Sequence, residues 1–474
     1  MHYISTRGQA PRLNFVDALL AGLARDGGLY LPEHYPALTA AEIADFAGQP
    51  YVDVAAKVIS SFTGDSFSQS ELKAMLTKAY SGFRHAALAP LVQLDNNLFV
   101  LELFHGPTLA FNDVAMQLLG RMMDAALKAR GQRATIVGAT SGDTGAAAIE
   151  AFRGLEQVDV FILYPHGRVS DVQRRQMTTV AGDNIHTIAL EGTFDDAQAI
   201  VKGMFNHHQF RDELALSGVN SINWARIVAQ TVYYFTSAVA LGGPHRKVSF
   251  SVPTGNFGDI LAGYIAKRMG LPVERLMIGT NANDILARAL HGGTYEVLGV
   301  QPTQSPSMDI QISSNFERLL FDCYDRDPAA IRTLMQTLAQ SGQFSLSAPA
   351  LARIRAEFDA AAIDEPATRA QMQRTYQDSA YLLDPHTAVG VGAARQVLAR
   401  DGATPVIVLG TAHPAKFPQA VAAATGVHPA LPAHLADLFD RTERFTVLAN
   451  DRSAVEAFIR QRSRIEKASA RSQS

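Results

Sequence analysis

Several features that would narrow the class of a protein are scarce in this 474-residue chain. It has one cysteine, Cys323, which excludes an internal disulfide and indicates a reducing compartment. Positive charge is not in excess, because the formal net charge is −3. The composition therefore offers no general attraction for nucleic acid or for anionic membranes, and we expect neither as a partner.

Long apolar runs are also missing. The first 14 residues lack the apolar core of a secretory signal. The most apolar stretch, residues 231–241, is too short to cross a bilayer core of about 30 Å. These two absences predict a cytoplasmic protein.

The residues that are present describe a globular chain in which strands and helices alternate. From residue 98 onward this alternation predicts a mainly parallel sheet covered by helices on both faces. We predict strands at residues 98–103, 134–139, 160–164, 185–190, 247–252 and 405–409, and helices at residues 15–24, 53–62, 71–80, 146–153, 195–205, 259–269, 383–396 and 417–424. We expect no strand between residues 315 and 378, and a polar, peripheral tail after residue 426 whose last ten residues fray.

The central stretch runs from a buried strand, through the turn His105-Gly106-Pro107, into an amphipathic helix. Thr108 is a candidate cap for a helix that begins near Leu109. The strand, turn and helix place the helix start at one edge of the sheet, where open α/β folds bind ligands.

Three further loops follow predicted strands. Glycines in the loop at residues 252–259 let backbone N–H groups converge at a helix start, which suits a phosphate. The loop at residues 138–145 offers hydroxyls and a helix start to a carboxylate or a phosphate, and the loop at residues 409–418 carries one threonine and one lysine. A dinucleotide site is the alternative for residues 138–145. We disfavour it because the next strand ends in Tyr164-Pro165-His166, without an acid for the ribose.

The motif Phe104-His-Gly-Pro-Thr-Leu-Ala-Phe-Asn-Asp113 resembles the cofactor-anchoring segment of the threonine synthase family, enzymes that depend on pyridoxal 5′-phosphate (PLP). Similar matches run from Tyr3 to about Pro418, including the segments at residues 220–226 and 384–390. The resemblance implies the fold-type II PLP architecture, an α/β fold of the tryptophan synthase β kind. It implies a helical domain at residues 1–92, a two-lobed α/β region at 93–425 with its smaller lobe at about 129–224, and a peripheral segment at 426–474.

The resemblance also implies roles for particular residues. The cofactor-binding set is Gly255, Asn256, Phe257, Gly258, Asp259 and Thr411, in which Thr411 faces the pyridine nitrogen. The substrate-binding set is Thr140, Ser141, Gly142, Asp143, Thr144, Arg226 and Lys416, in which Arg226 and Lys416 are expected to face the substrate phosphate. The catalytic position is Asn112, where the family has the lysine that binds PLP covalently.

The implied reaction converts O-phospho-L-homoserine and water into L-threonine and phosphate, the last step of threonine biosynthesis. Asn112 cannot form an imine, so no covalent imine with PLP is expected and this form should be inactive or impaired. Two explanations are open. The chain is a disabled variant or carries a sequence error, or else it is a natural non-catalytic relative that still binds PLP or a PLP–amino acid adduct. The alternatives for its function are a PLP- or metabolite-binding pseudoenzyme, or another fold-type II lyase acting on phosphorylated or hydroxylated amino acids. The sequence leaves the oligomeric state open.

Overall fold

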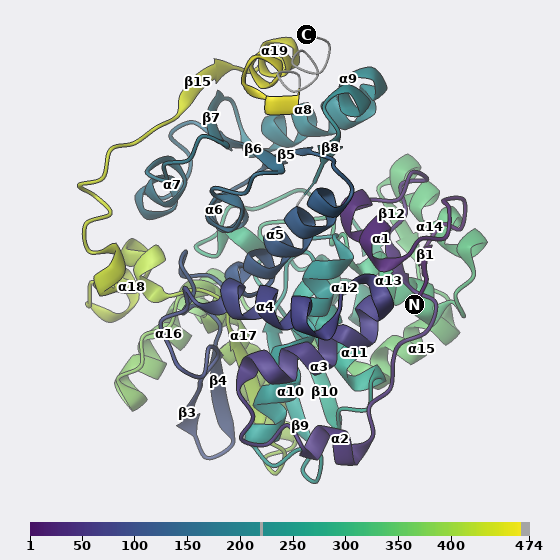
Figure 1. Cartoon of the computed structure of the whole chain (residues 1–474). Helices are drawn as coiled ribbons and strands as arrows, with labels where there is room; N and C mark the ends of the chain where they lie inside the picture. Colours follow the sequence, from purple (N-terminus) through teal and green to yellow (C-terminus); the bar gives the residue numbers. More distant parts are fainter. Residues whose placement is uncertain (219–220, 466–474) are drawn as a thin grey trace.

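A computed structural model describes residues 1–218 and 221–465 of the protein. The fold is built on two sheets of mainly parallel strands (Figure 1). The larger sheet has the strand order β13-β10-β9-β14-β4-β3, and only β3 runs antiparallel to its neighbour. Its strands are β3 (Leu91–Asp95), β4 (Leu98–Glu102), β9 (Val248–Pro253), β10 (Val273–Thr280), β13 (Phe358–Ala362) and β14 (Val406–Gly410).

The smaller sheet is parallel throughout and has the order β15-β7-β6-β5-β8. Its strands are β5 (Ala134–Ala139), β6 (Val158–Pro165), β7 (Ile185–Glu191), β8 (Leu216–Ser217) and β15 (Thr446–Ala449). Every residue of β6 and of β9 is buried, as expected for strands covered on both faces. Two short antiparallel pairs complete the strands: β1 (Tyr3–Ser5) with β2 (Tyr30–Pro32), and β11 (Thr294–Glu296) with β12 (Gln343–Ser345).

Helices cover both sheets, and α10 (Trp224–Ala240) is buried along almost its whole length. The helices of the front section, α1 (Phe15–Ala21), α3 (Tyr51–Thr63) and α4 (Gln69–Tyr80), pack in one core with α5 (Asn112–Ala129) and α10 (Figure 1). The remaining helices that position the site are α6 (Asp143–Phe152), α7 (Asp171–Thr178), α11 (Gly258–Arg268), α17 (Pro385–Arg400) and α18 (Pro418–Thr425). The others are α2 (Ala40–Ala44), α8 (Phe194–Asn206), α9 (His208–Glu213), α12 (Ile285–Gly292), α13 (Phe316–Cys323), α14 (Pro328–Ser341), α15 (Ala348–Glu357), α16 (Glu365–Ser379) and α19 (Arg452–Arg462).

The fold agrees with the predicted α/β alternation but corrects three expectations. The segment at 315–378 does contain strands, β12 and β13, and β13 forms the edge of the larger sheet by pairing with β10. The tail is not peripheral throughout, because β15 joins the smaller sheet beside β7 and α19 buries Val455 and Ile459 against the strands and helices of that sheet. Figure 1 shows this C-terminal chain, in yellow, running from α18 at the larger sheet to α19 at the smaller one.

The third correction concerns α5, which begins at Asn112 and not near Leu109. Two expectations also fall partly outside the described residues: the fraying of residues 466–474, and Asn220 in the segment at 220–226. Within residues 1–218 and 221–465, none of the helices combines the length and apolar character that a membrane crossing needs.

Candidate active site

The segment that leads into α5 is a tight turn with an unusual backbone. Leu109 has φ +62°, a left-handed conformation that costs energy for a residue with a side chain. Position 106 has room only for glycine, because a Cβ there would lie 2.5 Å from the Asp113 side chain. Asp113 accepts hydrogen bonds from the Thr108 backbone N–H at 2.7 Å and from the Thr108 hydroxyl at 2.8 Å. The predicted cap, Thr108, therefore bonds to a side chain in the first turn of α5 and not to the helix backbone.

Asn112 is the first residue of α5, and only 3% of its surface is exposed. Its side-chain nitrogen donates to the Thr144 hydroxyl at 3.3 Å, which joins α5 to α6. Its side-chain oxygen is buried and accepts no hydrogen bond from the described residues. A buried polar atom without a partner is costly, so the carboxamide suits this position poorly.

The loop after β5 is held by one hydroxyl. Thr140 Oγ1 accepts from the backbone N–H groups of Gly142 and Gly145, each at 2.9 Å. Gly142 adopts φ +145°, which only glycine adopts readily, and its place in the turn brings Asp143 to the start of α6. The predicted residues 140–144 thus form one compact turn against Asn112, with Ser141 half-buried beside it.

Lys416 lies close to this turn, but its ammonium contacts groups of the protein and not the space for a substrate phosphate that the sequence predicts. Its side chain is fully buried, and its ammonium contacts Asp143 Oδ1 at 2.9 Å, Gln176 Oε1 at 2.9 Å and the Thr108 carbonyl at 2.6 Å. An ammonium has three N–H donors, so these acceptors leave none for a substrate phosphate. Burial alone would raise the pKa of Asp143, but Lys416, together with Gln173 and His386, outweighs it and holds that pKa below its ordinary value.

The loop after β9 forms a cradle of backbone donors at the start of α11. Phe257 has φ +62°, and a Cβ on Gly255 would lie 2.9 Å from the Ser307 carbonyl oxygen, so this loop is tightly folded. The N–H groups of Gly255, Asn256, Phe257 and Gly258 donate to no acceptor within the described residues. Free N–H groups at a helix N-terminus attract an anion.

Behind the cradle lies a buried acid. Asp259 accepts a hydrogen bond from the Tyr233 hydroxyl, and its other carboxylate oxygen is buried without a hydrogen bond from the described residues. Burial raises the pKa of Asp259 to about 7. The nearby Arg226 is also buried, and burial lowers its pKa to about 10 although Tyr233 and Asp259 oppose that shift.

Thr411 follows β14 and is fixed by its backbone. Its N–H donates to Thr387 Oγ1 at 3.2 Å, and its carbonyl accepts from the Phe111 N–H at 2.8 Å. The second contact sets Thr411 directly beside the start of α5. The Phe111–Thr411 and Asn112–Thr144 contacts join the loops after β4, β5 and β14. Ser307 links the loop after β9 to them, because it lies beside Gly255 and its hydroxyl is 3.5 Å from Asp143.

Sequence reasoning missed several residues that support these loops. Ser307 donates its backbone N–H to His386 Nε2 at 3.2 Å, and His386 Nδ1 lies 2.9 Å from Asp384 Oδ1. Gln176, on α7, donates to the Thr108 carbonyl at 3.0 Å. Ser307 and Gln176 lie outside every motif, so no local signal identifies them.

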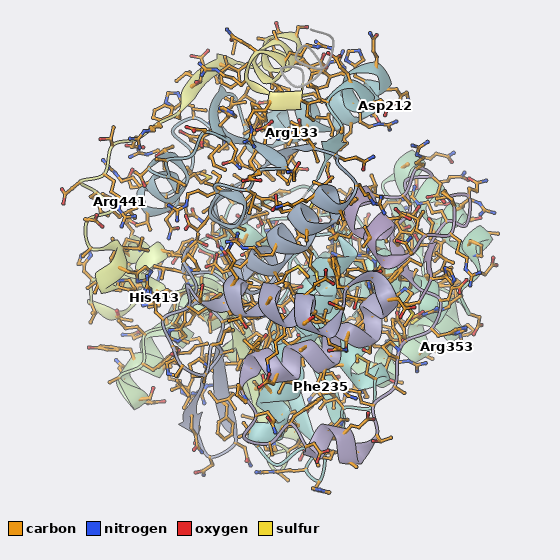
Figure 2. The ribbon with its side chains drawn as sticks, viewed as in Figure 1. Arg133, Asp212, Phe235, Arg353, His413 and Arg441 are labelled. Carbon is orange, nitrogen blue, oxygen red and sulfur yellow. The ribbon has the colours of Figure 1, made fainter. Side chains whose placement is uncertain are left out.

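Burial also affects a histidine of the loop after β14. His413, labelled in Figure 2, packs edge-on against Phe104, with ring centroids 5.4 Å apart. Burial, assisted by His105, lowers the pKa of His413 to about 4, so this imidazole is neutral near pH 7. We therefore assign His413 a packing role beside the site and no role in proton transfer.

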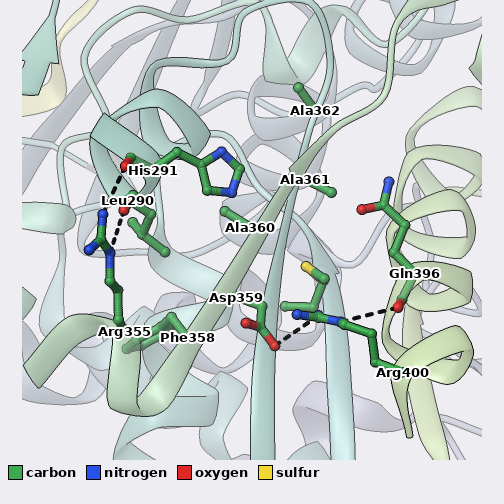
Figure 3. Close-up of a pocket in the computed structure, with 11 residues that line it drawn as sticks. Leu290, His291, Arg355, Phe358, Asp359, Ala360, Ala361, Ala362, Gln396 and Arg400 are labelled. Atoms are coloured by element: carbon green, nitrogen blue, oxygen red, sulfur yellow. Dashed lines mark hydrogen bonds and ion pairs between the residues drawn. The ribbon is translucent and has the colours of Figure 1, made fainter. Parts of the chain in front are cut away.

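An open cavity of about 650 Å³ lies elsewhere, at the outer edge of β13 (Figure 3). Its cations are engaged within the protein: Arg400 pairs with Asp359, and Arg355 donates to the carbonyls of Leu290 and His291. None of the predicted site residues lines this cavity. We therefore place the candidate active site at the four loops.

Comparisons with known proteins identify the family of the chain. Residues 2–80 match the family description "Threonine synthase N terminus", residues 83–411 match "Pyridoxal-phosphate dependent enzyme", and residues 387–459 match "Threonine synthase, C-terminal". A threonine synthase from Pseudomonas aeruginosa is 55% identical over 462 residues, which cover 97% of this chain and 98% of the relative.

Solved structures give the same result. A PLP-bound threonine synthase from Brucella melitensis has a TM-score of 0.96 and 60% identity, over 98% of this chain and 100% of that one. The yeast threonine synthase has a TM-score of 0.92 and 40% identity, over 97% and 98% of the two chains. The predicted fold class is confirmed, and the chain belongs to the threonine synthase family of fold-type II PLP-dependent enzymes.

Proposed function

We propose that the site is built for threonine synthase chemistry, the conversion of O-phospho-L-homoserine and water into L-threonine and phosphate. We further propose that Asn112 impairs this reaction in the present chain. The observation that carries the proposal is the position of Asn112. Its side chain contacts Thr144 in the loop after β5, and its neighbour Phe111 contacts Thr411 in the loop after β14. A residue at 112 therefore stands between the proposed substrate loop and the proposed cofactor loop after β14.

The loop after β9 fits the phosphate of PLP. Gly255, Asn256, Phe257 and Gly258 present backbone N–H groups without protein acceptors, and a side chain on Gly255 would have no room beside Ser307. We propose Asp259 as the buried support of this cradle. Arg226, in electrostatic contact with Asp259, is our proposed cation for the substrate phosphate.

Thr411 fits the pyridine nitrogen of PLP because its hydroxyl is neutral and its backbone is fixed by Thr387 and Phe111. When bound, PLP supplies an electron sink for carbanions next to the amino group of the substrate. A neutral hydroxyl partner leaves the ring nitrogen free of an added charge, whereas an aspartate would favour protonation.

The turn at residues 140–144 fits the substrate carboxylate. Thr140 holds the turn closed, so the donors left for a ligand are the Ser141 and Thr144 hydroxyls and the N–H groups at the start of α6. Gly142 allows the turn, and Asp143 is tied to Lys416. We propose that Ser141 and Thr144 bind the carboxylate directly and that Thr140 and Asp143 hold the loop.

Asn112 is the one residue of the site that does not fit. A carboxamide is neither a nucleophile toward PLP nor a base, so it cannot hold the cofactor covalently or move a proton. Loss of a positioned acid–base group alone costs about 10²–10⁴-fold in rate. A non-catalytic protein that binds PLP or a metabolite is the second candidate function, and Asn112 is the observation that favours it.

The test is phosphate release from O-phospho-L-homoserine, with threonine measured as the second product. We compare the present chain, Asn112→Lys, and the matched control Asn112→Gln, whose side chain is longer but has no amine. We expect release by Asn112→Lys only. Turnover of a different phosphorylated amino acid in place of phosphohomoserine would support another lyase, and an inactive lysine variant that still binds PLP would support the binding protein.

A further inference from the structure

We propose that Lys416 is a positioning residue that locks the turn before Asn112 to the start of α6, so that the cofactor and substrate loops keep one relative position. The names of these loops rest on the proposed function, whereas the lock itself rests on contacts within the chain. In this role Lys416 is not the cation for the substrate phosphate that the sequence predicts.

Lys416 joins three separate segments. Its ammonium contacts the Thr108 carbonyl in the turn before α5, Asp143 at the start of α6, and Gln176 on α7. Lys416 itself lies in a short 3₁₀ turn (Pro414–Lys416) after β14 and is 0% exposed. Because Lys416 is fully buried and all its N–H donors contact groups of the protein, its role is to hold these three segments together.

Thr108 is the point on which the lock acts. Asp113 holds its N–H and hydroxyl, and Lys416 and Gln176 both donate to its carbonyl, at 2.6 and 3.0 Å. The next residue, Leu109, has the left-handed φ of +62° and therefore needs outside support to stay in that conformation. Fixing every polar atom of Thr108 supplies that support three residues before Asn112.

The other end of the lock is Asp143. Lys416 balances its charge, Gln173 donates to the same carboxylate at 2.9 Å, and the Ser307 hydroxyl lies 3.5 Å from the second oxygen. Thr144, the partner of Asn112, is the next residue. Moving the Asp143 carboxylate would therefore move the hydroxyl that faces position 112.

The first experiment measures backbone hydrogen exchange by mass spectrometry in the present Asn112 protein, without cofactor. Lys416→Met removes the ammonium but leaves a buried charge on Asp143, so Lys416→Met/Asp143→Asn and the neutral change Gln176→Met are made as well. We expect exchange at residues 106–113 and 142–146 to quicken together, on the order of tenfold, in every variant that folds. The control is Lys267→Met, which breaks the Lys267–Glu357 pair outside the site and should leave both segments unchanged.

The second experiment uses the Asn112→Lys background. A positioning role predicts that Lys416→Met/Asp143→Asn lowers kcat while the inhibition constant of inorganic phosphate changes less than about threefold. A rise of that constant by about tenfold or more, with unchanged hydrogen exchange at both segments, would overturn the proposal in favour of a phosphate-binding cation. If Asn112→Lys is inactive, the proposed function fails, and hydrogen exchange alone still decides whether Lys416 is the lock.

Discussion

The side-chain nitrogen of Asn112 donates a hydrogen bond to the Thr144 hydroxyl across the junction of α5 and α6, at 3.3 Å. The side-chain oxygen of Asn112 is buried and has no donor among the described residues. The site around this pair presents donors in the loop after β9 and a fixed hydroxyl in the loop after β14. In the proposed function, Asn112 is the side chain that does not fit PLP and these loops are the residues that bind it.

The phosphate cradle is tested by Gly255→Asp. The new side chain would start 2.9 Å from the Ser307 carbonyl and bring a negative charge to N–H groups that we assign to a phosphate. We expect the Kd for PLP in an equilibrium titration to rise about 100-fold or more, or ~2.7 kcal/mol. Gly402→Asp is the control, because Gly402 is exposed at a loop outside the site. Unchanged PLP affinity in Gly255→Asp would remove this loop from the cofactor site.

The role of Thr411 is tested by Thr411→Ala. The two backbone contacts of this residue survive the change, so the fold should keep its melting temperature. One neutral hydrogen bond contributes about 0.5–1.5 kcal/mol, which predicts a two- to tenfold loss of PLP affinity. A drop in melting temperature with no change in PLP binding would make Thr411 a structural residue.

The sequence predicts the strands that consist of short buried apolar runs bounded by turn residues. Residues 134–139 were predicted and observed with the same bounds. The strand β13 was missed because Phe358-Asp-Ala-Ala-Ala362 has no β-branched residue, and only pairing with β10 makes it a strand. The start of α5 was misplaced because the local capping pattern ignores Asp113, which takes the donors of Thr108.

The site, like the fold, is predictable only where the signal lies in the local sequence. Motifs locate the loops at the carboxyl ends of β4, β5, β9 and β14, because glycines and hydroxyls at strand ends are visible in the sequence. They do not reveal that Lys416 is enclosed by Asp143 and Gln176, since that depends on how the loops of the two sheets meet. The role of a lysine is set by its neighbours in space, which no single motif contains.

Asp259 makes the stability of the protein depend on pH. Its pKa is about 7 in the folded protein, against about 3.9 when unfolded, so between these values the folded state holds a proton that the unfolded state has lost. This carboxyl therefore contributes stability at low pH that is lost as the pH rises toward 7. Asp259→Asn should raise the free energy of unfolding, relative to the parent, by up to about 1.4 kcal/mol per pH unit across this window.

The measurement is denaturant unfolding of parent and variant at about pH 5 and about pH 8. The control is Thr231→Val, which removes a buried, non-titrating hydroxyl that donates to the Ile227 carbonyl on the same helix as Tyr233. It should shift stability equally at both pH values. An equal shift in Asp259→Asn would show that the Asp259 carboxyl does not titrate in this window.

The covalent link is tested by borohydride reduction in the presence of PLP, followed by peptide mass analysis. The present chain should carry no pyridoxyl label at position 112, because an amide nitrogen does not attack an aldehyde. Asn112→Lys should be labelled there, since burial at 3% exposure disfavours the charged ammonium and leaves a nucleophilic amine next to the loop after β14. Asn112→Gln, with the amide moved one carbon outward, should stay unlabelled and so separates the amine from side-chain length. Specific label on another lysine of the Asn112 protein would contradict the assignment, and Lys416 is the least suited to take it, because its three donors are held by Thr108, Asp143 and Gln176.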